Sequence, residues 1–237
     1  ESPAISPHDP NFLLVGTNMG GVCKSSDGGH SWTFIDGDYL RKMNYYSSTP
    51  SSRHFNSPWA FHPTDPNFIL AGSWINGFMK STDKAMTWQK IDGPWDNARL
   101  KGWPNPKRGP HVIQFDPHQP NVAIAAFNDY LYPYNVKLFK TTDKAQTWQP
   151  LTDLPSASGP VLDILFIAQS DLILVGCTNS ILVSSDGGNS WTPRRLNDLN
   201  PDDTSDFKIM GFSGASIEDY TKLYATVPTK VESNSST

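Results

Sequence analysis

The feature that most constrains the fold is an eight-residue pattern that occurs four times along the chain. Each copy has two Ser or Thr residues, an Asp, three variable residues, another Ser or Thr, and a Trp; the copies begin at Ser25, Ser81, Thr141 and Ser184. The pattern predicts a tight turn, because an Asp carboxylate can accept N–H groups of its own turn and Gly allows a positive φ. The Trp then packs beside the turn.

A second landmark precedes each copy, so the repeat unit is longer than the turn itself. The sequence Pro-x-Asp-Pro-Asn occupies 7–11 and 63–67, a variant occupies 117–121, and a degenerate version occupies 168–171. Short apolar runs at 12–16, 68–72, 122–127 and 172–177 lie between the landmarks, bounded by turn residues as strands are. We therefore predict four strands in each repeat unit. The first strand ends at the Pro-x-Asp-Pro-Asn landmark, and the last strand begins at the Trp.

Four-stranded sheets repeated around an axis are the blades of a β-propeller. We predict an all-β chain, a single β-propeller domain or part of one over 1–237, with antiparallel blades at about 1–36, 57–92, 111–152 and 160–196. A partial blade at 207–228 has strands expected at 208–213 and 222–227, followed by a tail at 229–237. Four and a half blades leave unpaired edges, so we expect a missing C-terminal segment or another chain to complete the propeller.

Composition and motif content exclude several classes of function. The net charge is −4 and only 18% of the 237 residues are charged, which argues against nucleic-acid partners and a polybasic membrane patch. No apolar run reaches the roughly 18 residues of a membrane helix. Cys23 and Cys177 form neither a disulfide framework nor a zinc pattern, and we expect both to be free and buried. No nucleotide, zinc or serine-hydrolase motif occurs, so no cofactor and no metal are expected.

Antiparallel order separates the two edges of each predicted sheet. The turns after the first and third strands share one edge, here called the turn edge; the connections after the second and fourth strands share the other, the loop edge. His8, His62 and His118 are expected to pack at the turn edge. We assign a structural role to the Asp and Trp of each turn, namely Asp27, Trp32, Asp83, Trp88, Asp143, Trp148, Asp186 and Trp191.

The loop edge gathers long irregular segments rich in aromatic and polar side chains, at 36–56, 92–110, 152–159 and 197–206. Flat rings beside hydrogen-bonding groups suit pyranose sugars, so the aromatic side chains of these segments, Trp95 among them, are candidates for sugar contact. Several of these aromatics could instead pack the loops. His54 and His111 are further candidates for acid/base chemistry. The predicted substrate-binding residues are Tyr45, Tyr46, Trp74, Asn76, Trp103, Arg108, His111, Asn128, Asp129 and Tyr130.

The repeated turn resembles the Asp-box, or BNR, repeat of sialidases, sortilin-type receptors and xyloglucan-specific glycoside hydrolases. This resemblance covers almost the whole chain and implies the fold, but not the chemistry. The stretch Gly-Thr-Asn-Met-Gly-Gly-Val-Cys-Lys at 16–24 resembles the G-T-D-x-G-G-x-Y-R stretch of the xyloglucanase family, and the connector at 107–111 resembles a Gly-rich connector there. By this resemblance Asn18 occupies the position of one catalytic Asp, and Cys23 replaces a usual Tyr.

The resemblance implies part of a secreted, extracellular or periplasmic, endo-acting and inverting glycoside hydrolase with a polysaccharide or oligosaccharide partner. Inverting hydrolysis needs an acid and a base about 6.5–9.5 Å apart, and the amide of Asn18 cannot be the base. In the family the partner acid comes from a second propeller, so this chain alone is expected to be inactive. Its status as an enzyme stays open.

Three explanations of Asn18 remain: a natural non-catalytic relative, a glycosidase or lyase that uses other groups, or an engineered replacement of Asp. The alternative functions are a non-catalytic glycan-binding propeller and a sortilin-like or assembly-factor propeller that binds proteins. A sialidase is disfavoured because the chain lacks the R-I-P stretch of that family.

Overall fold

The structure, a computed structural model, describes residues 2–17, 21–35, 59–73, 77–96, 109–127, 136–155, 158–194, 209, 211–217 and 220–226. These residues form four four-stranded sheets and one two-stranded sheet, all antiparallel. Their helical element is a 3₁₀ turn, η1 (Pro94–Asp96). In the described part of the chain, no helix has the length and apolar character needed to cross a membrane.

Each four-stranded sheet is built from consecutive strands, as the repeats predict. The first sheet contains β1 (Ser2–Ile5), β2 (Leu13–Thr17), β3 (Gly21–Ser25) and β4 (Thr33–Phe34), and the second contains β5 (Trp59–Phe61), β6 (Ile69–Ser73), β7 (Gly77–Ser81) and β8 (Gln89–Ile91). The third contains β9 (Val112–Phe115), β10 (Ala123–Phe127), β11 (Lys137–Thr141) and β12 (Gln149–Pro150), and the fourth contains β13 (Val161–Phe166), β14 (Ile173–Cys177), β15 (Ile181–Ser184) and β16 (Thr192–Arg194).

The fifth sheet is a hairpin of β17 (Gly211–Ile217) and β18 (Tyr220–Thr226). The expected boundaries of its first strand, 208–213, were wrong. Pairing runs without interruption from Gly211 with Thr226 to Ile217 with Tyr220. The strand therefore continues past the expected end at 213, up to the short connection that leads to β18.

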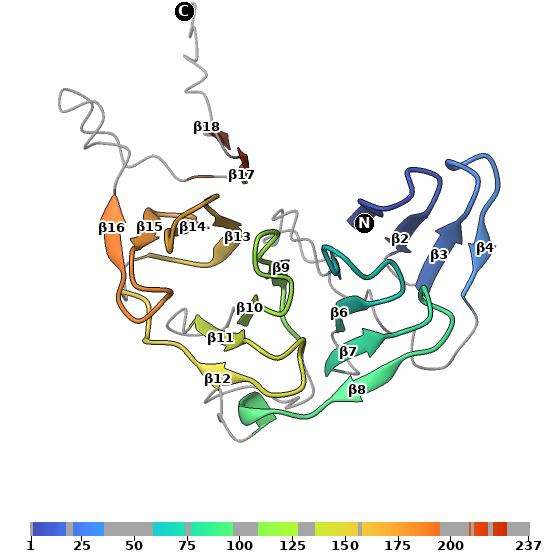
Figure 1. Cartoon of the computed structure of the whole chain (residues 1–237), viewed down its shortest axis with the longest axis horizontal. Helices are drawn as coiled ribbons and strands as arrows, with labels where there is room; N and C mark the ends of the chain where they lie inside the picture. Colours follow the sequence, from blue (N-terminus) through green and yellow to red (C-terminus); the bar gives the residue numbers. More distant parts are fainter. Residues whose placement is uncertain are drawn as a thin grey trace, which may run out of the picture.

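The sheets are arranged around an arc, with the last strand of each four-stranded sheet on the outside (Figure 1). The first strands of consecutive sheets make contact along the inside, β5 with β9, β9 with β13, and β13 with β17. This radial arrangement confirms the predicted all-β architecture of four-stranded blades.

The middle sheets are buried on both faces, which explains why their strands are continuous apolar runs. In β10, Ala123, Ala125 and Phe127 pack against the second sheet. The intervening Ile124 and Ala126 pack against the fourth. Side chains of a strand alternate between the two faces, so a sheet between two others needs apolar residues at every position.

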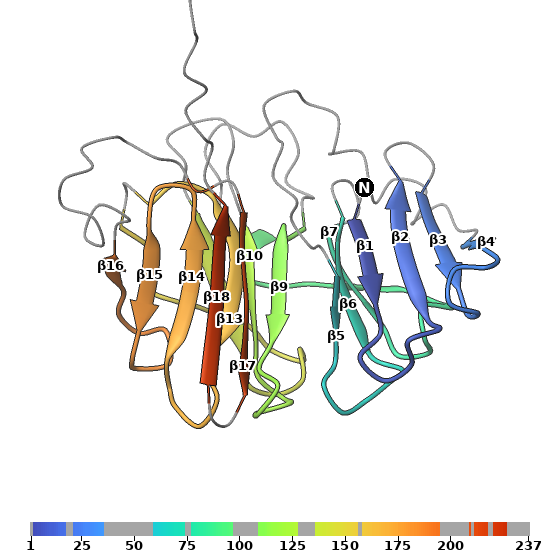
Figure 2. The same ribbon diagram turned by 90° about the horizontal axis from the view of Figure 1, so that it is seen from above.

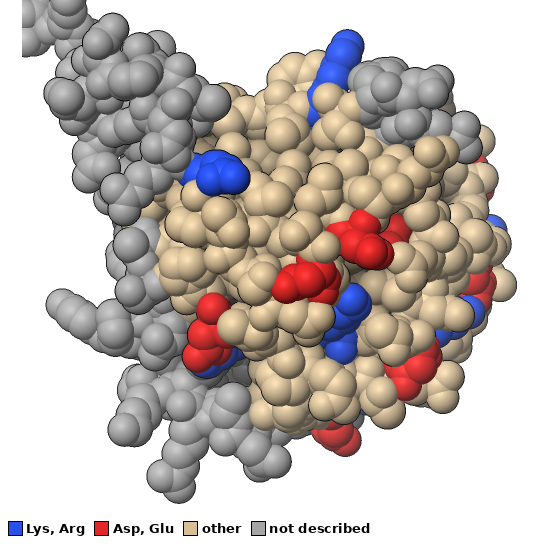
Figure 3. Space-filling view, turned by 60° about the vertical axis from the view of Figure 1, so that its left-hand side comes forward, with Lys and Arg blue, Asp and Glu red and all other residues tan. Residues whose placement is uncertain are grey.

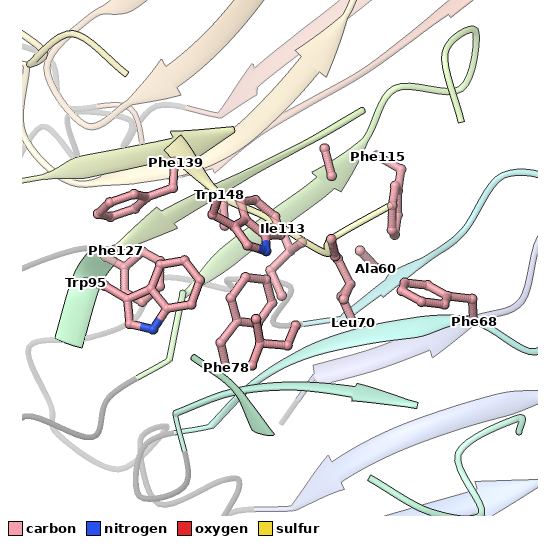
Figure 4. Close-up of a cluster of buried hydrophobic side chains, with 14 residues drawn as sticks. Ala60, Phe68, Leu70, Phe78, Trp95, Ile113, Phe115, Phe127, Phe139 and Trp148 are labelled. Atoms are coloured by element: carbon pink, nitrogen blue, oxygen red, sulfur yellow. The ribbon is translucent and has the colours of Figure 1, made fainter. Parts of the chain in front are cut away.

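An aromatic cluster fills the space between the second and third sheets (Figure 4). Trp95 stacks on Phe127 with ring centroids 5.2 Å apart and an interplanar angle of 21°. Its ring also meets the edges of Phe139 and Trp148. Only 6% of Trp95 is exposed, so its expected place among the sugar-binding aromatics is corrected: burial in this core takes the ring out of the loop surface.

Candidate functional site

The turn edge and the loop edge lie at opposite ends of the strands (Figure 2). The connections after the first and third strands of each sheet share the turn edge, because neighbouring strands are antiparallel. At the loop edge, the second strand ends where the third begins. In the first sheet this meeting point is the pair Thr17 and Gly21.

Each aspartate turn is closed by the same hydrogen bonds. In the third sheet the Thr141 hydroxyl donates to Oδ1 of Asp143 at 2.8 Å and accepts the N–H of Ala145 at 3.1 Å. Asp143 then accepts the Thr147 N–H at Oδ1 (2.8 Å) and the Thr147 hydroxyl at Oδ2 (2.6 Å). The corresponding triplets make the same contacts in the other sheets: Ser25, Asp27 and Ser31; Ser81, Asp83 and Thr87; Ser184, Asp186 and Ser190.

These hydrogen bonds hold the carboxyl groups in their charged form. The Ser31 hydroxyl is the main cause that lowers the pKa of Asp27, and the Ser190 hydroxyl lowers the pKa of Asp186 to about 2. For Asp143 burial is the largest single cause and acts in the opposite direction, but the hydrogen bonds from Thr147, Thr141 and Gln146 together outweigh it, and the pKa falls to about 2. A carboxylate that accepts several hydrogen bonds within its own turn is poorly suited to donate a proton.

The turns need two consecutive residues with positive φ. Gly28 and Gly29 meet this need in the first sheet, with φ of 73° and 92°, and Gly187 and Gly188 in the fourth. The equivalent pairs in the second and third sheets are Lys84 with Ala85 and Lys144 with Ala145, whose φ values lie between 55° and 63°. The hydrogen bonds of the turn therefore impose a left-handed backbone even where no glycine is present.

An ion pair joins two sheets at the turn edge, and a buried histidine lies beside it. Nζ of Lys144 lies 2.7 Å from Oδ2 of Asp65 and 5.0 Å from the ring centre of Phe68. His62 accepts the N–H groups of Thr64 and Asp65 at Nδ1 (3.2 and 3.0 Å), so its proton sits on Nε2. Burial, followed by the positive charge of Lys144, lowers the pKa of His62. This environment agrees with the packing role expected for His62.

Most predicted loop-edge residues lie outside the described residues. They are Asn18, Tyr45, Tyr46, Trp74, Asn76, Trp103, Arg108, Asn128, Asp129 and Tyr130, and the alternative acid/base candidate His54. Their proposed roles therefore stay predictions.

His111 is the predicted substrate-binding residue that the structure describes. It is half-buried and directly precedes β9 at the loop edge, where its N–H donates to the Ala126 carbonyl at 2.8 Å. The adjoining Pro110 runs so close to β6 that a Cβ on Gly72 would lie 1.8 Å from the Pro110 carbonyl oxygen. His111 is thus placed by a connector that is packed on the neighbouring sheet.

The fourth sheet also contributes to the loop edge. Its turn at 178–180 is tied to the preceding connector: the Asn179 N–H donates to the Ser158 carbonyl at 3.0 Å, and the Thr178 N–H to the Pro160 carbonyl at 3.1 Å. The hydroxyls of Ser158 and Ser180 are buried and have no hydrogen-bond partner within the described part of the chain. The turn of the fourth sheet is thus held against the connector that precedes the sheet.

Asp163 is a titratable residue at this edge that sequence reasoning missed. It lies near the loop-edge end of β13, beside a β-bulge between Val161 and Asp163, and its Oδ1 accepts the Ile164 N–H at 2.9 Å. Burial raises the pKa of Asp163 to about 6. The available signal was a single charged residue inside the apolar run 161–166. A carboxyl group that titrates near pH 6 can give or take a proton under mild conditions.

The described residues show scattered charge and no assembled metal site. Acidic and basic side chains are interspersed on the face shown in Figure 3. Within the described ranges no group of three or more His, Cys, Asp or Glu side chains comes together to hold a metal ion. Cys23 and Cys177 are both free as expected, but only Cys177 is fully buried, whereas Cys23 is half-buried.

The radial sheets and their two distinct edges define the class of this protein as a β-propeller. No family model matches the sequence. A curated relative from Neosartorya fischeri, described as a probable oligoxyloglucan-reducing end-specific xyloglucanase, is 26% identical over 198 residues, which cover 78% of this chain and 22% of the relative.

Several solved structures have a similar fold, and GH74 enzymes are among them. The GH74 xyloglucanase from Xanthomonas campestris matches with a TM-score of 0.60 and 17% identity, over 90% of this chain and 32% of that one. An ancestral GH74 enzyme matches with a TM-score of 0.64 and 21% identity, over 95% and 27%. YCF48 bound to D1 peptide matches with a TM-score of 0.57 and 14% identity, over 96% and 61%.

The chain therefore has the β-propeller fold that the GH74 xyloglucanase structures share, and its sequence is similar to that of a probable xyloglucanase. It spans about a fifth of the length of the curated relative and about 30% of the two GH74 structures.

Proposed function

We propose that this chain is part of a secreted glycoside hydrolase whose propeller binds a polysaccharide at the loop edge. The observation that carries the proposal is the sequence match to a xyloglucanase, which extends over 198 residues and so includes most of the described sheets. Xyloglucan is accordingly the first polysaccharide to test.

The chemistry of the loop edge fits such a ligand. Aromatic faces stack on the C–H side of pyranose rings, and a few polar groups fix the orientation of the sugar. Among the predicted contacts, His111 lies at this edge on a packed connector. Asn18 occupies the position where the resemblance expects one catalytic Asp, so we propose that this chain binds the glycan and does not itself supply the base.

The test compares the complete natural protein with an Asn18→Asp variant on a panel of polysaccharides that includes xyloglucan. We expect retardation of both proteins in gels that contain xyloglucan, and release of reducing sugars by the variant but not by the natural protein, which would identify a hydrolase whose base is replaced by Asn18. The control is Asn121→Asp, the same chemical change at an exposed turn-edge position, which should leave both readouts unaltered. Absence of retardation by every polysaccharide would refute glycan binding.

Two other outcomes identify the alternatives. Retardation without sugar release by either protein would indicate a non-catalytic glycan-binding propeller. The structural match to YCF48 bound to D1 peptide makes a protein-binding propeller the second candidate. Saturable binding of extended peptides from an array, combined with no retardation by glycans, would favour that candidate.

A further inference from the structure

His62 directly follows β5 and holds the turn that leads to β6. Its Nδ1 accepts the N–H groups of Thr64 and Asp65, at 3.2 and 3.0 Å. Its Nε2 is buried and has no hydrogen-bond partner among the residues that the structure describes. The ring lies against Phe68 and Phe115, with centroid distances of 5.6 and 5.0 Å, and only 2% of the residue is exposed. The neutral ring therefore fits this site, whereas a second ring proton would find no acceptor.

Two contacts with neighbouring sheets start from the turn that His62 holds. The His62 carbonyl accepts the Nε2–H group of His8, from the first sheet, at 2.7 Å. Oδ2 of Asp65 accepts a hydrogen bond from Nζ of Lys144, in the third sheet, at 2.7 Å. The conformation of one short turn, 62–67, therefore determines whether the second sheet keeps these polar contacts with both of its neighbours.

The charged and titratable groups around His62 come from three sheets. They are His8 of the first sheet, Asp65 of the same turn, Lys144 of the third sheet, and Asp116 and His118, which follow β9. Burial is the main cause that lowers the pKa of His62; Lys144 adds to the effect and Asp65 opposes it. The charge of His8 also acts to lower this pKa. The hydrogen bond from Lys144 holds the pKa of Asp65 below its usual range, so Asp65 stays charged in mild acid.

The equivalent turns of the other sheets are held differently. In the first sheet, Oγ of Ser6 accepts the N–H group of His8 at 3.2 Å. In the third, Oδ1 of Asp116 accepts the N–H group of His118 at 2.8 Å. In the fourth, Ile167 stands at this position. Histidine is the side chain whose ordinary pKa lies closest to neutral pH. The second sheet therefore has an acceptor that responds to mild acid where a different acceptor can hold the same turn.

We propose that the turn at 62–67 is an acid-sensitive switch: when Nδ1 of His62 takes up a proton, the turn opens and the second sheet loses its contacts with His8 and Lys144. A protonated Nδ1 is a donor and can no longer accept the N–H groups of Thr64 and Asp65. A buried imidazolium would also leave both of its own N–H groups without acceptors, which is costly. Opening lets water reach the ring and removes this cost. The switch does not rest on glycan binding.

Hydrogen exchange measured by NMR on the complete natural protein tests the switch. Folding lowers the pKa of His62 from 6.5, so the closed turn is favoured above about pH 6.5 and is lost as the pH falls below it. Protection of the Asp65 and Phe68 amides, corrected for the intrinsic pH dependence of exchange, should fall about tenfold or more between pH 7.5 and pH 5. The Ile167 amide, at the equivalent point of the fourth sheet, should stay protected.

A His62→Asn variant separates the switch from general sensitivity to acid. The side-chain oxygen of Asn can accept the same N–H groups, as Asp116 does in the third sheet, but it does not titrate. Protection of the Asp65 amide should then change less than about twofold over the same pH range, since no proton uptake is coupled to opening. His8→Gln is the matched control: it removes the neighbouring histidine, keeps a donor for the His62 carbonyl, and should retain the pH dependence.

A second measurement on the natural protein keeps the test decisive if His62→Asn does not fold. The NMR signals of the His62 ring report its protonation, and their midpoint should coincide with the pH at which the Asp65 amide loses protection. Protonation of His62 while the Asp65 amide stays protected would overturn the proposal, and so would full protection at pH 5. The same pH dependence in His62→Asn would also overturn it. Simultaneous exposure of the Ile167 amide would do so as well, because the whole fold would then be opening.

Discussion

Lys144 of the third sheet donates from Nζ to Oδ2 of Asp65 of the second sheet at 2.7 Å, which joins two turns that are 79 residues apart in sequence. The same ammonium group lies over the Phe68 ring and lowers the pKa of the neighbouring His62. One cation thus links two sheets and disfavours protonation of a buried imidazole.

Replacing Lys144 by Met should weaken this link and shift the titration of His62. Both charged side chains are about one-third exposed, so we expect a loss of roughly 0.5–1 kcal/mol in the free energy of unfolding. The pKa of His62 should rise but stay below its ordinary value, because burial is the larger cause. NMR titration of the histidine signals measures this shift. Lys84→Met is the matched control, since Lys84 has the same left-handed backbone at an exposed position.

Removing one turn carboxylate should destabilise the fold without any effect from core packing. Asp143→Ala deprives the Thr141 hydroxyl and the Thr147 N–H and hydroxyl of their acceptor, and we expect a loss of roughly 1–3 kcal/mol. Thr142→Ala in the same turn changes an exposed side chain and should stay within about 0.5 kcal/mol. Urea denaturation measures both values. Equal effects of the two substitutions would contradict the role of the carboxylate.

Asp163 should make the fold less stable at neutral pH than a neutral isostere would. Its pKa is raised from 3.8 to about 6, so the folded state holds this proton more tightly than the unfolded state does. Stability contributed by this residue therefore increases as the pH falls from about 6 to about 4. Asp163→Asn should add roughly 1–3 kcal/mol at pH 7.5 and much less near pH 4. Unfolding curves at both pH values test this; a gain independent of pH would count against it.

Two glycines with similar backbone angles should differ in their tolerance of a methyl group. Gly29 and Gly188 have φ of 92° and 97°, so Ala at either position costs about 1 kcal/mol in backbone strain. A Cβ on Gly188 would also lie 2.9 Å from Leu151, whereas a Cβ on Gly29 would find its nearest contact, Trp32, at 3.7 Å. Gly188→Ala should therefore lower the melting temperature more than Gly29→Ala. Equal decreases in melting temperature would show that Leu151 can move away from the added methyl group with no loss of stability.

The sequence predicted the repeated sheets well because their signals are local. The turn at 141–148 is closed by hydrogen bonds between Thr141, Asp143 and Thr147, all within eight residues, so the pattern alone specifies it. The apolar runs likewise marked the second strand of each sheet to within about a residue. The loop-edge residues chosen from the sequence remain predictions, apart from the placement of His111.

Tertiary packing decided what the local pattern left open. The residues around Trp95 in the sequence are typical of a surface loop, but contacts with Phe127 and Phe139 of another sheet bury its ring. Asp163 acquires its raised pKa from the cluster around it, and Cys23 stays half-buried because no described sheet covers it. The sequence determined which residues form turns and strands, since those interactions span few residues. Only the stacking of distant sheets determined which side chains are buried, because burial depends on a neighbour far away in the chain.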